Sequence, residues 1–150
     1  MVKFKEPFNG ISHLLGRLAS VVVTILLAGA AVTRGGARAA PPFLIYRLSM
    51  VLLYSASATY HMVQVKDKVL EIFRKVDHAA IYFLIAGTYT PFCVNAFTGF
   101  WKWGMLSIIW SLAIIGILVK VFYIRAPRWL NAGIYIIMGW MCVGAAGQML

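Results

Sequence analysis

The sequence predicts an all-α protein, a bundle of membrane-spanning helices. Of its 150 residues, 62% are hydrophobic and only 12% are charged, and the mean hydropathy is +0.84. Soluble domains use roughly 45–50% apolar residues, so this chain has too little charge to cover a soluble globule. The apolar residues also gather in runs of about 20, the length that crosses a bilayer as a helix. We therefore predict one multipass domain over residues 1–150.

Five apolar runs define the predicted transmembrane helices. They are Ile11–Val32, Phe43–Val63, Ala79–Phe97, Trp103–Tyr123 and Trp129–Leu150. The first run follows a basic start with Lys3 and Lys5, but no small-residue cleavage site follows it. It is therefore predicted to be a retained helix and not a removed signal peptide.

The gaps between the runs carry turn formers or charges that end each helix. Arg34-Gly35-Gly36 to Pro41-Pro42 separates the first two helices, and Thr98-Gly99-Phe100 predicts a tight turn before the fourth. The gap from Gln64 to Val76 is charged and can form a helix at the membrane interface. Arg125 to Arg128 separates the fourth helix from the fifth.

The net charge of +10 indicates membrane topology and not nucleic-acid binding, because the basic residues fall in short gaps without interleaved aromatics. Basic residues are enriched in cytoplasmic loops. More of them lie on the side of the N-terminus than on the opposite side, so we predict a cytoplasmic N-terminus in the cell membrane. Arg47, inside the second helix, is expected to extend toward the membrane surface. Membrane lipids are the expected partners, and no nucleic acid is expected.

Polar residues occur at those ends of three helices that this topology places on the same side of the membrane. They are Glu6, Asn9 and His13 at the first helix, Ser57 and His61 at the second, and Asp77 and His78 at the third. Ser57 and His61 are four residues apart and share a helical face. Polar groups near lipid are costly, so the cluster is expected to have a partner, a metal or a function.

Imidazole, carboxylate and hydroxyl groups together suit a zinc site with a bound water. A catalytic zinc normally takes three protein ligands, and spacing alone does not show that the histidines converge. Structural roles are the alternatives. His61 can bond a backbone carbonyl, Ser57 can pack between helices, and Asp77 can cap the third helix. Glu6 and His13 can form a pair that holds the N-terminus against the bundle.

The chain resembles the haemolysin III family, the bacterial branch of the progestin and adipoQ receptor superfamily. The motifs that carry the resemblance are Glu6–His13 (EPFNGISH), Tyr54–His61 (YSASATYH), Arg74–Tyr82 (RKVDHAAIY), Ala86–Phe92 (AGTYTPF) and Pro127–Trp129. These motifs occur in the same order as in the family, and each lies on the predicted segment.

The resemblance implies a seven-helix membrane protein with an intramembrane zinc near the cytoplasmic side. His61 falls on a zinc ligand, Ser57 on its accompanying serine, and Asp77 on the aspartate that hydrogen-bonds the zinc-bound water. Glu6, Asn9 and His13 form a family signature. The other zinc histidines belong to an HxxxH motif on the family's last helix, which this sequence lacks. The chain is thus expected to be a C-terminally truncated member that does not complete the zinc site.

The first functional hypothesis concerns the intact protein. In that form we expect a zinc-dependent hydrolase of an amide or ester bond in a lipid, with His61 holding zinc, Asp77 positioning the water and Ser57 supporting the substrate or water. A pore-forming or haemolytic protein is one alternative, although a pore needs a polar stripe along several helices. A lipid-sensing, receptor-like protein is another.

Overall fold

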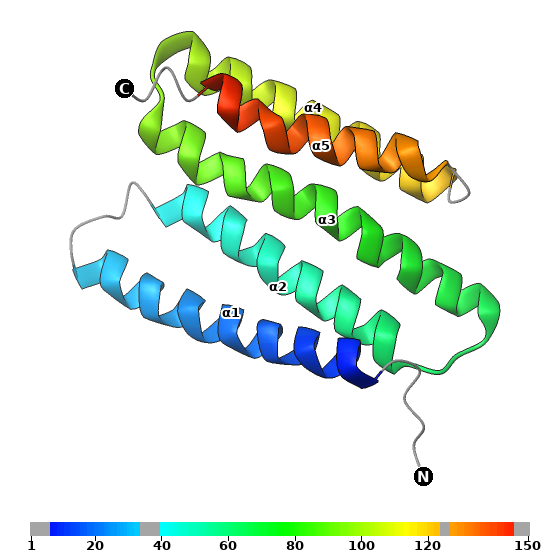
Figure 1. The fold of residues 1–150 in the computed structure, drawn as a ribbon. Coiled ribbons are helices and arrows are strands. Elements are labelled where there is room, and N and C mark those ends of the chain that lie inside the picture. The colour runs from blue at the N-terminus through cyan, green and yellow to red at the C-terminus, as the bar shows by residue number, and fades with distance from the viewer. Residues whose placement is uncertain (1–6, 34–39, 124–126, 146–150) are drawn as a thin grey trace.

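The computed structural model describes residues 7–33, 40–123 and 127–145. Over these residues it contains five helices and no strand, which confirms the predicted all-α class (Figure 1). The helices are α1 (Pro7–Thr33), α2 (Ala40–Met62), α3 (Asp67–Ala96), α4 (Gly99–Phe122) and α5 (Arg128–Ala145). Each one contains a predicted apolar run or most of it.

The largest difference from the predicted boundaries lies in α3. The sequence predicted this helix from Ala79, but α3 begins at Asp67 and runs for 30 residues. Most of the charged gap is therefore helical and continuous with the apolar part. Its side chains support a helix, since Lys75 lies 3.7 Å from Glu71 as an i,i+4 ion pair. Asp67 also lies in the first turn, where a negative charge is favourable.

The connection from α3 to α4 is as short as predicted. Only Phe97 and Thr98 separate the two helices. Gly99 then has a φ of 53°, a left-handed conformation that glycine adopts without a steric penalty. The chain can thus reverse within a few residues and return antiparallel to α3.

The helices run up and down, and each packs against the next one in the sequence (Figure 1). In the part that the structure describes, α1 contacts α2 alone, whereas α5 contacts both α4 and α3. The stretch Phe8–Leu26 of α1, together with α3 and α4, is long and apolar enough to cross a membrane. These spans support the predicted membrane bundle.

The main apolar core lies between α3, α4 and α5. Tyr82, Ile109 and Met138, one from each helix, are fully buried. The hydroxyl of Tyr89 donates to the Met138 carbonyl at 2.7 Å and accepts from the Cys142 amide at 2.9 Å. These bonds tie α3 to α5.

Many large apolar side chains lie on the outer faces of the helices. Ile114, Ile115, Ile136 and Ile137 are each more than half exposed. A soluble monomer rarely presents such broad apolar surfaces. Hydrocarbon of the bilayer is the medium that fits them.

Candidate functional site

The first three helices bring their polar residues to one end of the bundle. Because α1 and α2 are antiparallel, the start of α1 lies beside the end of α2, where a methyl group on Gly10 would overlap the Met62 side chain. The short link of residues 63–66 then leads directly into α3. His13, Ser57, His61 and Asp77 meet there, as the order of the segments predicted.

Asp77 is the centre of this cluster. Its residue is only 7% exposed, and Ser57 beside it is 3% exposed. The His78 ring lies beside the Asp77 carboxylate, Ser57 of α2 is close enough to interact with it, and His61 lies within electrostatic range of it. A buried carboxylate is stable only with such partners. Ser57 and His61 come from one face of α2, since they are four residues apart.

Asp77 lies inside α3 and does not begin it. The residue at the N-cap position is Lys66, and its side chain makes no capping hydrogen bond. The interpretation of Asp77 as a helix cap is therefore wrong. Its carboxylate interacts instead with His78 of the same helix and with Ser57 of α2.

His13 of α1 lies against His61 of α2. Their ring centroids are 5.6 Å apart in an edge-to-face arrangement, and Tyr54 packs on the other side of His13 at 6.0 Å. The His13 Nδ1 atom is buried and has no hydrogen-bond partner among the described residues. His13 thus joins the cluster, and its ring presents a free nitrogen there.

The remaining residues of the first motif are placed less centrally. Asn9 is exposed near the start of α1, and its carbonyl accepts a hydrogen bond from the Ser12 hydroxyl at 3.0 Å. Glu6 lies outside the described residues. The predicted pair of Glu6 with His13 therefore stays a prediction.

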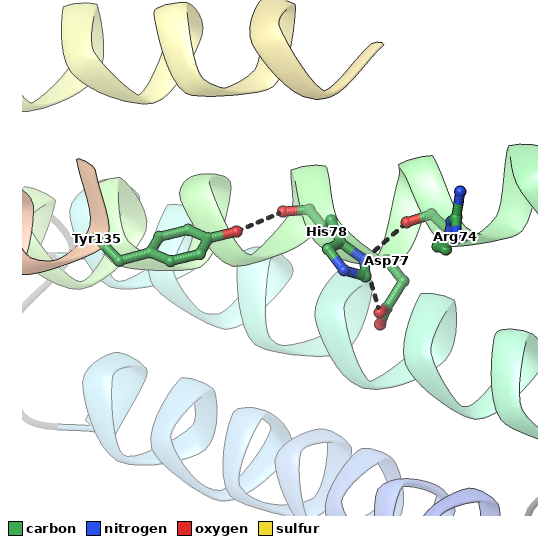
Figure 2. Close-up of polar contacts among 4 residues, drawn as sticks. All are labelled: Arg74, Asp77, His78 and Tyr135. Carbon is green, nitrogen blue, oxygen red and sulfur yellow. Dashed lines mark hydrogen bonds and ion pairs between the residues drawn. The ribbon is translucent and has the colours of Figure 1, made fainter. Parts of the chain in front are cut away.

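His78 lies next to Asp77 and is contacted by Tyr135, as Figure 2 shows. The Nδ1 atom of His78 is 2.9 Å from the Arg74 carbonyl oxygen, which can only accept, so Nδ1 carries the proton. The same atom lies 3.4 Å from Oδ2 of Asp77. From α5, the Tyr135 hydroxyl donates to the His78 carbonyl at 3.4 Å. Tyr135 had no signal in the sequence, because it lies in an ordinary apolar run.

The donor chemistry of the cluster is only part of what a zinc ion requires. His61 offers an imidazole, and Asp77 with Ser57 can hydrogen-bond a water molecule. A catalytic zinc takes three protein ligands. Across residues 7–33, 40–123 and 127–145, no three His, Cys, Asp or Glu residues are grouped closely enough to hold a metal ion. These residues do not make a complete zinc site by themselves.

Comparison with known proteins agrees with the family resemblance that the sequence motifs indicate. A model of the family described as haemolysin-III related matches residues 1–150. The chain is 43% identical over 143 residues to a hemolysin-3 of Bacillus cereus. It is 38% identical over 139 residues to a hemolysin-3 homolog of Bacillus subtilis (strain 168). These alignments cover 94% and 93% of the chain but 64% and 65% of the relatives, so the chain spans just under two thirds of their length.

Proposed function

Because the chain belongs to the haemolysin-III-related family of membrane proteins, we propose that the Asp77 cluster is part of a zinc-dependent site that hydrolyses lipids. The bond cleaved would be an amide or ester bond within the membrane. The observation that carries this proposal is the buried carboxylate of Asp77, with Ser57 and His61 close enough to interact with it.

Each residue has a role that its placement supports. Asp77 is positioned to accept a hydrogen bond from a water molecule and then to take its proton. Ser57 would help to orient the carboxylate, since it is close enough to interact with it. His61 is the proposed zinc ligand of this cluster, and further ligands would come from beyond the described residues. A zinc ion bound there would lower the pKa of the bound water toward neutrality.

The proposed setting is the cell membrane, with the N-terminus and the cluster on the cytoplasmic side. The basic residues Lys66, Lys68 and Lys75 lie near this end of the bundle. Such residues favour the cytoplasmic face. The substrate would then be a lipid that reaches the cluster from the inner leaflet.

The test measures hydrolysis of amide- and ester-linked lipids by the product of the complete reading frame that contains these residues, reconstituted in liposomes with zinc. Asp77→Asn and His61→Ala should each lower turnover by at least about 100-fold, the usual contribution of a general base. Asp67→Asn is the matched control, since Asp67 is an exposed carboxylate on the same helix, and it should leave turnover unchanged. Full activity in Asp77→Asn would overturn the proposal.

Membrane lysis is the second candidate, and the names of the two relatives are what favour it. A conducting path needs a polar lining along several helices, whereas α4 and α5 present apolar outer faces. Dye-loaded liposomes test this candidate directly. Leakage that persists in Asp77→Asn would assign lysis to another part of the protein, and no leakage above an empty-liposome control would remove this candidate.

A further inference from the structure

We propose that a groove between α1 and α2, at Arg47, binds the phosphate of an anionic phospholipid. This site lies toward the opposite end of α2 from the Asp77 cluster. Arg47 and His61 are about four helical turns apart, or ~20 Å at a rise of about 1.5 Å per residue. The proposal therefore does not depend on the proposed hydrolase activity.

The side chain of Arg47 crosses to α1. Its Nη1 atom donates to the Thr24 carbonyl at 3.3 Å. Gly10 lies beside Met62 and Gly16 beside Tyr54, so in this antiparallel pair Thr24 is level with Arg47. The side chain thus reaches across the helix pair to the backbone of α1, a contact that the sequence did not predict. Its Nε atom is buried and has no hydrogen-bond partner among the residues that the structure describes.

Among the residues that the structure describes, no acidic side chain pairs with Arg47. The described acidic residues are Asp67, Glu71 and Asp77, and all three belong to the part of α3 that follows the far end of α2. An ionised arginine among apolar helices is costly without a counter-charge. An anionic ligand in the groove would supply that counter-charge.

The groove beside Arg47 has a volume of about 200 Å³. Gly16 and Ala19 of α1 leave this space because their side chains are so small, and Val23 and Met50 make its walls apolar. The two aliphatic hydroxyls of the lining donate within α1, since Ser20 donates to the Arg17 carbonyl and Thr24 to the Ser20 carbonyl. The groove thus offers one cationic group beside an apolar channel, which matches a headgroup and the start of an acyl chain.

A phospholipid fits this groove better than another occupant. On the same two helices Val22, Leu44 and Leu48 are exposed and apolar, as expected for helices that face hydrocarbon. Arg47 is within about 10 Å of the start of α2, close enough to the headgroup layer for a phosphate to reach it. Guanidinium groups pair with phosphate through two parallel hydrogen bonds. Basic pockets between transmembrane helices are known to hold anionic headgroups in this way.

The test is native mass spectrometry of the purified protein released from detergent micelles. Phosphatidylglycerol is titrated, with phosphatidylcholine and oleate as comparison lipids. The protein should retain phosphatidylglycerol in preference to both. Arg47→Gln should weaken this binding at least about tenfold, because a charged hydrogen-bonded pair is lost. Lys102→Gln is the matched control, since it removes a positive charge near the same end of the bundle outside the groove, and it should retain the binding.

A second variant keeps the charge and fills the groove. Ala19 is exposed and lines the groove, so Ala19→Phe should fold and should lose phosphatidylglycerol. If Arg47→Gln does not fold, the result for Ala19→Phe decides. Unchanged binding in either folded variant would overturn the proposal. Binding of oleate alone, or a carboxylate of a copurified protein occupying the groove, would overturn it as well.

Discussion

At the scale of single residues, Asp77 and Arg47 show how this chain treats charge inside an apolar bundle. Asp77 is buried, with His78 beside its carboxylate and Ser57 and His61 close enough to interact with it. Arg47 has a backbone partner on α1, and no acidic side chain of the described residues pairs with it. Burial of either charge is costly without a partner. The Asp77 carboxylate has partners within the chain, whereas the Arg47 guanidinium is proposed to bind a ligand.

The interaction of Ser57 with Asp77 should contribute to stability as well as to the site. In Ser57→Ala the carboxylate loses a polar partner in a buried position, so the free energy of unfolding should fall by about 1–3 kcal/mol. Ser111→Ala removes an exposed hydroxyl and should change it by less than about 0.5 kcal/mol. Reversible unfolding in mixed micelles measures both variants. Equal values for the two would show that the interaction with Asp77 adds nothing.

At the scale of helices, small residues determine how closely the elements approach. A methyl group on Gly87 of α3 would overlap the Ser49 hydroxyl of α2, and one on Gly116 of α4 would overlap the Tyr82 ring of α3. Close approach of this kind is typical of membrane helices, where small residues let backbones pack tightly. The glycines therefore determine the spacing on both faces of α3.

This role in helix packing predicts that alanine substitution affects stability differently at two glycines. Gly116→Ala should destabilise the contact between α3 and α4 by about 1–3 kcal/mol, because the Tyr82 ring must move out of a packed position. At Gly139 of α5, a methyl group would meet nothing within 4 Å. Gly139→Ala should be neutral, or stabilising by up to about 1 kcal/mol through helix propensity. Thermal unfolding of the two variants compares them, and equal destabilisation would contradict the packing argument.

At the scale of the whole molecule, two parts differ in how they are held together. The part formed by α3, α4 and α5 contains the large buried side chains. In the described structure, α1 is attached through α2 alone, and serines and alanines are prominent among the buried residues of this pair, as at Ser20, Ser49, Ser57 and Ala58. Both proposed sites lie at or beside α2, where small side chains leave room for polar groups and a ligand.

The up-and-down arrangement predicts which loops face the cytoplasm. With 30 residues, α3 is ~45 Å long, more than the ~30 Å of the hydrocarbon core, so its two ends lie on opposite sides. In a background with Cys93→Ala and Cys142→Ala, Thr98→Cys should react with an impermeant maleimide added to intact cells. Lys66→Cys should react only after the cells are opened. The reverse pattern would place the N-terminus outside, and reaction of both from one side would contradict the span.

The sequence by itself determined the fold class, the five helices and the meeting of Ser57, His61 and Asp77 at one end of the bundle, because apolar runs and their order suffice for these. Tertiary structure decided the rest. Hydropathy detects only the apolar part of a helix, so it placed the start of α3 at Ala79. The sequence allowed a separate helix in the charged gap, and the structure shows that this segment is continuous with α3, where an i,i+4 ion pair supports it. The approach of His13 to His61, the bond from Tyr135 to His78 and the crossing of Arg47 to α1 depend on how each helix is rotated about its axis. Packing against neighbouring helices sets that rotation, through small residues far apart in the sequence.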